Sequence, residues 1–239
     1  MATSIFCQNA EFHHNYRSIV LFFQKGTAMK TAKIYVTVTE GIDEAALREA
    51  EALIPSWRRE YSAKKRFPAR VNSVFAYLLL QRLTKKEFGV FDPTPFTYKK
   101  ADKPYFSQLD LFFSLSHCKT AVGAAASKSE IGFDIIDNRR VNERAAIRIC
   151  SPDEWKLYEA AEDKQRFLRQ LWCKKESMVK QSGTGFTEGF DTADTAKADF
   201  FTYEGGEYFA ALYLDGGILG DKARICLEEI PWRQLLCKN

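Results

Sequence analysis

The chain has 239 residues, 28% of them charged and 46% hydrophobic, and a formal net charge of only +4, which argues against nucleic-acid binding by bulk electrostatics. Its apolar runs fall short of the roughly 20 residues that span a membrane, so we expect no membrane segment and a cytoplasmic location. The six cysteines contain no CxxC pair, which favours reduced thiols over disulfides or zinc.

The first 28 residues differ from the rest of the chain because they show little periodicity. After Met29 a strand pattern begins, with apolar residues alternating at Ile34, Val36 and Val38. We therefore expect residues 1–28 to be an extension and Met29 to be the functional start.

The remaining elements follow from apolar periodicity and from glycine and proline signals. Helices are expected at 43–53, 71–88 and 143–149, and from Ser151 to about Gln181 with a break near 162–163. Strands are expected at 111–115, 121–126, 131–136, 200–203, 208–214 and 223–230, with hairpin turns at 205–206 and 216–217. This order predicts an α+β fold with an N-terminal half at 29–128 and a C-terminal half at 129–239.

Three side chains in the C-terminal half predict a site. Asp134 lies in an otherwise apolar strand, where a carboxylate is costly unless it meets a cation or hydrogen-bond donors. Glu176 and Lys180 lie one turn apart on a helix, whose apolar face also holds Lys175, expected to be partly buried and paired. Two carboxylates and a lysine suit a hard divalent cation and a phosphate. The alternatives are a loop cap at Asp134 and an ordinary Glu–Lys helix pair.

Ser116 and His117 lie at a strand-to-turn junction. Side chains that are adjacent in sequence diverge, so this pair suits a phosphate-binding turn better than a nucleophile and its base. A turn histidine without a ligand is the alternative. The segment Lys103-Pro104-Tyr105 would present a lysine from a stiffened loop.

Five short motifs stand in order along the chain: KPYF (103–106), FSLSH (113–117), IGFDI (131–135), SPDEW (151–155) and WCKKESMVKQSGTG (172–185). With them the chain resembles the Sfp-type 4'-phosphopantetheinyl transferases. The resemblance implies a monomer of two pseudo-symmetric α/β halves with coenzyme A bound between them. It also implies transfer of the 4'-phosphopantetheine of coenzyme A to a serine of an apo acyl or peptidyl carrier protein, with release of adenosine 3',5'-bisphosphate.

The resemblance also implies roles for individual residues. Asp134 and Glu176 would ligate Mg²⁺, Lys180 would contact the phosphate, and Glu176 or Glu154 would act as general base. Residues expected to hold coenzyme A are Arg70, for the 3'-phosphate, together with Lys103, Pro104, Ser116, His117 and Lys180.

One position departs from the family pattern. Where many members carry a third acid, this chain has Ile136, followed by Asp137. Either water completes the metal shell or Asp137 moves in, and we favour water. Two alternatives to the transferase are another coenzyme A-dependent transferase that needs no metal and a non-catalytic relative that binds carrier proteins.

Overall fold

The computed structural model describes residues 18–20, 30–90, 94–98, 103–185, 193–214 and 223–237. Its strands are β1 (Ser18–Val20), β2 (Lys30–Val38), β3 (Thr97–Tyr98), β4 (Pro104–Tyr105), β5 (Phe112–His117), β6 (Ala121–Ser127), β7 (Ile131–Asp137), β8 (Phe200–Glu204), β9 (Tyr208–Leu214) and β10 (Ala223–Glu229). Its helices are α1 (Glu44–Ala52), α2 (Ser56–Ala63), α3 (Phe67–Phe88), α4 (Glu143–Ile149), α5 (Pro152–Ala160), α6 (Lys164–Ser182) and α8 (Trp232–Leu236), with a 3-10 turn η2 (Thr195–Lys197). This mixture of helices and sheets confirms the α+β class.

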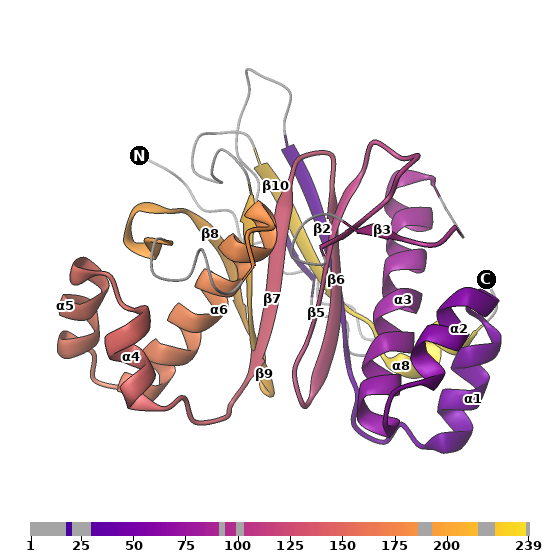
Figure 1. Ribbon diagram of the computed structural model, residues 1–239, viewed down its shortest axis with the longest axis horizontal. Coiled ribbons are helices and arrows are strands. Elements are labelled where there is room, and N and C mark those ends of the chain that lie inside the picture. Colours follow the sequence, from indigo (N-terminus) through magenta and orange to yellow (C-terminus); the bar gives the residue numbers. More distant parts are fainter. Residues whose placement is uncertain are drawn as a thin grey trace, which may run out of the picture.

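Two sheets form the centre of the molecule, and each is covered by one long helix (Figure 1). A five-stranded sheet has the order β1-β10-β2-β6-β5 and packs against α3. A three-stranded sheet has the order β7-β9-β8 and packs against α6. The late strand β10 pairs in parallel with β2, so the end of the chain returns to the sheet that the first half builds.

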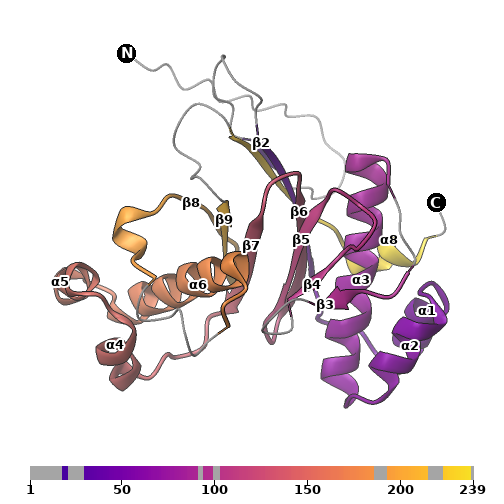
Figure 2. The same ribbon diagram turned by 45° about the horizontal axis from the view of Figure 1, so that its top comes forward.

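The two sheets meet where β5 and β7 run beside each other (Figure 2). No backbone ladder joins these strands in the described pairing; serine hydroxyls of β5 bond to the β7 backbone instead. Ser114 Oγ accepts from the Phe133 amide at 3.0 Å, and Ser116 Oγ accepts from the Ile135 amide at 3.2 Å. The alternating serines of FSLSH therefore fix the register of β7 against the first sheet.

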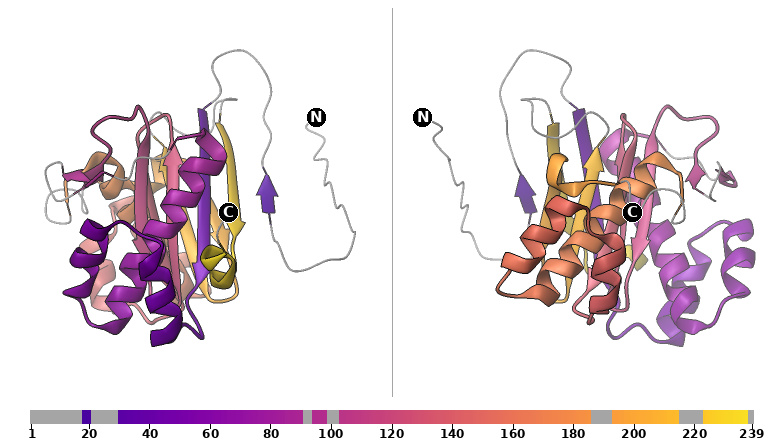
Figure 3. Two further views of the ribbon diagram at one scale, coloured as in Figure 1. Left: turned by 90° about the vertical axis from the view of Figure 1, so that its right-hand side faces the viewer. Right: turned by 60° about the vertical axis from the view of Figure 1, so that its left-hand side comes forward.

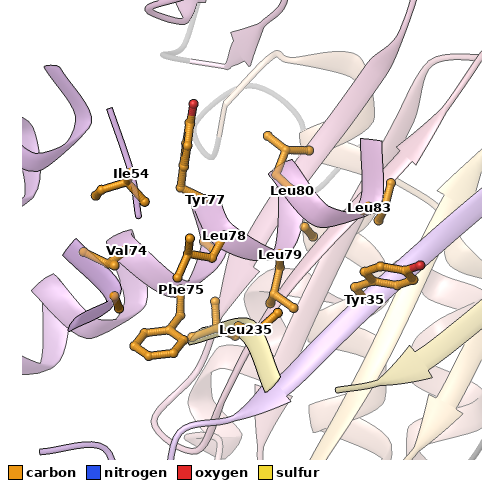
Figure 4. Packing of buried hydrophobic residues seen from close by; sticks show 14 of the residues in the cluster. Tyr35, Ile54, Val74, Phe75, Tyr77, Leu78, Leu79, Leu80, Leu83 and Leu235 are labelled. Atoms are coloured by element: carbon orange, nitrogen blue, oxygen red, sulfur yellow. The ribbon is translucent and has the colours of Figure 1, made fainter. Parts of the chain in front are cut away.

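The core of the N-terminal half lies between α1, α3 and the five-stranded sheet. Figure 4 shows Leu79 and Leu83 of α3 facing the sheet beside Tyr35, with Leu235 of α8 packed below the helix. Helix α3 has Pro68 in its first turn and ends at Gly89, whose φ of 67° is readily adopted by glycine. A proline and a glycine in the sequence thus set the two ends of the long helix α3, which packs across the sheet.

Most expected elements are confirmed within one to four residues, including the break between α5 and α6, where Asp163 caps the second helix. Sequence reasoning did not anticipate α2, α8 or the short strands β3 and β4. The turn at 216–217 and most of 1–28 lie outside the described residues. Of the N-terminal segment only β1 is described; it lies beyond β10 at the sheet edge (Figure 3). The function of 1–28 and the division at 128/129 stay predictions.

Within the described ranges, no helix combines the length and apolarity that crossing a membrane requires.

Candidate active site

Asp134, Ser116 and Lys180 form a hydrogen-bonded triangle at the junction of the two sheets. Ser116 Oγ donates to Asp134 Oδ1 at 2.6 Å, and Lys180 Nζ lies 2.7 Å from the same oxygen and 2.9 Å from Ser116 Oγ. Asp134 is only 6% exposed, so its charge depends on these partners. The structure therefore joins the middle of β7, the end of β5 and the last turns of α6 in one polar cluster.

Glu176 belongs to the same cluster through its charge. It is half-buried on α6, one turn before Lys180. Burial, and then repulsion from Asp134, raise the pKa of Glu176 to about 7, while Lys180 and Arg139 oppose the shift. Two carboxylates that repel each other in a partly dry site form a place where a cation is favourable. The two carboxylates therefore interact through their charges, and their joint role as metal ligands stays a prediction.

The approach of α6 to β7 depends on a glycine. A Cβ atom placed on Gly132 would lie 1.8 Å from the Ser177 carbonyl oxygen and 2.4 Å from the Gln181 amide nitrogen. No side chain fits in that space, so Gly132 allows the helix backbone to lie directly on the strand. Asp134 and Lys180 meet because this contact brings their elements together.

His117 ends β5 beside the triangle, with part of its ring in solvent. Partial desolvation, and then the positive charge of Lys180, lower the pKa of His117; Lys65 acts in the same direction and Asp134 opposes it. The imidazole is thus neutral near pH 7 in the free chain, and a bound anion would favour its charged form. The interaction with Lys65 also places the end of α2 near this site.

Lys103 directly precedes the short strand β4, which begins at Pro104. Lys103 Nζ donates to the Gln181 carbonyl oxygen at 2.7 Å and lies 3.5 Å from the Ile131 carbonyl oxygen. The lysine therefore holds the C-terminal end of α6 against the start of β7. Its expected contact with the nucleotide stays a prediction, as does that of Pro104.

Arg70 lies in the first turns of α3, where Glu51 of α1 binds it. Its Nη2 atom lies 2.9 Å from both carboxylate oxygens of Glu51, and Nε lies 3.1 Å from one of them. Glu44 adds a weaker contact at 4.0 Å. For Arg70 to bind a 3'-phosphate as expected, its guanidinium would have to contact the phosphate while it still binds Glu51, or else release Glu51.

Glu154 is enclosed in a separate network under α6. Its Oε2 atom accepts from the Ser151 amide at 2.7 Å and pairs with Lys175 Nζ at 2.9 Å, while Oε1 accepts from the amide and the hydroxyl of Thr195 at 2.7 Å each. Glu154 is 1% exposed and the Lys175 side chain 0%. The expected burial and pairing of Lys175 are confirmed. Because both oxygens of Glu154 are occupied, the geometry favours a structural role over that of general base.

Ile136 and Asp137 lie on opposite faces of β7. Ile136 is 1% exposed and packs in a small apolar cluster with Cys173 and Phe209. Asp137 accepts from the Lys119 amide at 3.1 Å and from the Arg139 amide at 3.2 Å. With its oxygens occupied on the far face, Asp137 is poorly placed to join Asp134 and Glu176. Consistently, the described residues contain no group of three or more His, Cys, Asp or Glu side chains that could hold a metal.

Sequence reasoning missed two basic residues that act on the site, Lys65 and Arg139. Arg139 follows β7 by two residues, and its position directly after the predicted aspartate strand is a signal that could have identified it. Lys65 lies in a basic cluster that sequence alone cannot distinguish from a solvated surface.

The C-terminal half matches a known family. A sequence model described as the 4'-phosphopantetheinyl transferase superfamily covers residues 130–217. The matched residues 130–217 make up less than half of the chain. They include β7, α6 and β9, and so they carry Asp134, Glu176 and Lys180.

Individual relatives carry the same name or a related one. The 4'-phosphopantetheinyl transferase of Bacillus subtilis is 29% identical over 120 residues, which are 48% of this chain and 53% of that protein. The 4'-phosphopantetheinyl transferase psf-1 of Bacillus pumilus is 31% identical over 93 residues, 38% and 40% of the two chains. The holo-[acyl-carrier-protein] synthase of Sodalis glossinidius is 38% identical over 66 residues, 25% and 52% of the two chains. The chain thus spans about half the length of the relatives it matches, or less.

Proposed function

We propose that this protein is an Mg²⁺-dependent 4'-phosphopantetheinyl transferase that acts on an apo carrier protein with coenzyme A as donor. The observation that carries the proposal is the cluster of Asp134, Glu176 and Lys180 within the residues that match the superfamily. In the reaction, the serine oxygen of the carrier forms a bond to the phosphorus next to pantetheine. The bond from that phosphorus to the bridging oxygen breaks, and adenosine 3',5'-bisphosphate leaves.

The donor set fits a hard cation. Asp134 and Glu176 offer carboxylate oxygens from two elements, and burial, followed by their mutual repulsion, raises the pKa of Glu176. Mg²⁺ in phosphate-transfer sites is commonly bound by one or two carboxylates together with substrate phosphate and water. Asp134 and Glu176 would therefore hold the ion, which when bound would supply positive charge to the diphosphate oxygens. Water would stand where Ile136 offers no ligand.

Lys180 and His117 suit the diphosphate itself. Lys180 Nζ, now 2.7 Å from Asp134 Oδ1, would stabilise the charge that develops on the departing phosphate. His117 and Ser116 lie beside it at the end of β5, where the histidine can gain a proton as the anion binds. Lys65 adds a second positive charge on the α2 side. Together these residues would orient the diphosphate against the ion.

Glu176 is the better candidate for the general base. Its side chain is half-buried at the site, in the cluster with Asp134 and Lys180 that would meet the diphosphate. Glu154 already accepts hydrogen bonds on both oxygens. Glu176 would take the serine proton directly or through a water.

An acidic carrier would meet a basic surface beside the site. The exposed arginines between β7 and the end of α4 are Arg139, Arg140, Arg144 and Arg148. Their charges can steer an acidic partner toward Asp134 and Glu176. We further propose that the protein acts as a monomer, because one chain supplies all the residues of the cluster, and that it acts in the cytoplasm, as its cysteines without a CxxC pair favour.

The test is a mass measurement on an apo carrier protein incubated with the protein, coenzyme A and Mg²⁺. We expect the carrier to gain one phosphopantetheine. Asp134→Ala and Glu176→Ala should abolish the gain, whereas Glu159→Ala, which removes an exposed acid from α5, should leave it intact. No gain on any of several carriers would refute the proposal.

The same assay separates the alternatives. Activity that survives EDTA would indicate a coenzyme A-dependent transferase without a metal. Carrier binding without mass gain would indicate a non-catalytic relative.

A further inference from the structure

A groove lies on the outer side of the N-terminal half, on elements that carry none of the clustered site residues. It is lined by the end of α1, one face of α3 and the end of α8, which lie together on the right of Figure 1. Its volume is about 570 Å³, within the range of roughly 300–1,000 Å³ that small-molecule sites occupy.

The floor of the groove is apolar. Leu53 follows α1, Leu78 projects from α3, and Leu235 comes from α8. Leu78 and Leu235 are also members of the core cluster, and Figure 4 shows Leu235 packed beneath α3. Leu78 and Leu235 are only 5% and 6% exposed and Leu53 is half-buried, so a chain lying in the groove would bury mainly the apolar surface of Leu53 and the exposed edges of the other two.

One wall of the groove is basic. Arg82, Lys85 and Lys86 line it from consecutive turns of α3, and the described lining contains no acidic side chain. Arg82 Nη1 donates to the Gln234 carbonyl oxygen at 3.0 Å, which fixes the guanidinium at the groove. Lys86 pairs with Glu228 at 3.3 Å. Exposed ion pairs contribute little free energy, so Lys86 can leave Glu228 for another anion at little cost.

The next acid along α3 does not cancel this charge. Glu87 binds Lys33 Nζ at 2.7 Å and accepts from the Tyr35 hydroxyl at 2.7 Å, on the side of the helix that faces β2. The positive wall therefore faces the groove without an acid opposite it among the lining residues.

We propose that this groove is a binding site for a small amphipathic anion, a linear-chain carboxylate whose tail lies on the three leucines and whose head meets Lys85 and Lys86. The basic wall selects the negative head, and the apolar floor selects the chain. A protein partner fits less well, because three leucines offer far less area than the roughly 800 Å² per side of a stable protein interface. The proposal is independent of the transferase activity.

Isothermal titration of the full chain with dodecanoate below its micellar concentration tests the proposal. We expect saturable binding of one dodecanoate per chain, with acetate and dodecanol binding at least tenfold more weakly. The double variant Lys85→Ser/Lys86→Ser should weaken dodecanoate at least fivefold. The control Lys156→Ser/Lys197→Ser removes two lysines whose side chains are 74% and 75% exposed elsewhere and should bind as the parent does.

The thiol of Cys237 can report whether dodecanoate binds in the groove. Cys237 is exposed and lines the groove, whereas Cys173 is buried and Cys226 is half-buried. Dodecanoate should slow the reaction of a disulfide reagent at Cys237, and Cys237→Ser should remove the slowed phase. The proposal is overturned by equal dodecanoate binding in both double variants, by equal binding of dodecanol, or by binding without protection of Cys237. Binding only of an acidic amphipathic peptide would assign the groove to a protein partner and also overturn it.

Discussion

The buried pair of Lys175 and Glu154 gives the sharpest prediction about stability. Lys175 Nζ lies 2.9 Å from Glu154 Oε2, and the two side chains are 0% and 1% exposed. Removing one partner of a buried pair leaves an uncompensated charge and costs about 3–5 kcal/mol. We therefore expect Lys175→Met, and equally Glu154→Gln, to lower the free energy of unfolding by about that amount.

Urea unfolding measures the effect, and α5 offers a matched control. Lys156 pairs with Asp153 at 2.9 Å, but the side chains are 74% and 52% exposed. Lys156→Met should therefore cost no more than about 0.5 kcal/mol. The double variant Lys175→Met/Glu154→Gln should lie closer to the parent than the sum of its single variants, by about 2 kcal/mol or more, because it buries no lone charge.

The reasoning fails if Lys175→Met unfolds like Lys156→Met, or if the effects of the two substitutions in the double variant are additive.

The same variants connect stability to the site, because Lys175 directly precedes Glu176 on α6. The pair joins α6 to the start of α5 and to η2 through Thr195, so it fixes the helix that presents Glu176 and Lys180. Single variants should therefore also lose the proposed transferase activity.

Three further predictions concern β7 and α6. Gly132→Ala should cost at least about 3 kcal/mol in urea unfolding, because its Cβ would lie 1.8 Å from the Ser177 carbonyl oxygen, whereas Gly206→Ala, with nothing within 4 Å, should change little. Ile136→Glu should lower the melting temperature of the metal-free protein, because position 136 is buried in an apolar cluster. Adding Mg²⁺ should raise the melting temperature of this variant more than that of the parent. An equal rise in both proteins would refute the water-completed shell. Glu176 binds its proton more tightly when folded, so the free energy of unfolding should fall as pH rises from about 4.5 to about 7, and Glu176→Gln should remove that slope; an unchanged slope would contradict the raised pKa.

Local signals in the sequence predicted a large part of this structure. Ser151 and Glu154 form the capping box that a serine followed three residues later by glutamate indicates, and Asp163 caps α6 at the expected break. Apolar runs located the core strands. These signals act over a few residues, and their physical basis does not depend on the rest of the fold.

Long-range partners could not be predicted in the same way. Glu154 was a candidate base because its acid stands in a motif, but Lys175 and Thr195, which occupy its oxygens, come from distant elements. Arg70 was expected to meet a phosphate, and only tertiary packing brings Glu51 to it. The return of β10 to β2 likewise has no local signal. Charges and strand edges are satisfied by whichever partners the topology brings near.

The triangle of Asp134, Ser116 and Lys180 leads to a prediction about coupling between ligands. In the metal-free chain Lys180 Nζ lies 2.7 Å from Asp134 Oδ1, so it partly neutralises the carboxylate that Mg²⁺ would use. A bound diphosphate would attract Lys180 to its own oxygens and would leave Asp134 free to hold the ion. Mg²⁺ should therefore bind more tightly when coenzyme A is present, and by linkage coenzyme A should bind more tightly with Mg²⁺ by the same factor, typically about 5–150-fold.

Calorimetric titrations of Mg²⁺ with and without coenzyme A measure this factor. Lys180→Met should strengthen Mg²⁺ binding to the chain alone, because the competing cation is gone, and should reduce the coupling to what direct contact between Mg²⁺ and the diphosphate provides. The control Lys156→Met leaves the triangle intact and should retain the parent factor. If Lys180→Met weakened Mg²⁺ binding to the chain alone, the lysine would not compete with the metal for Asp134, and the argument for its transfer to the phosphate would fail.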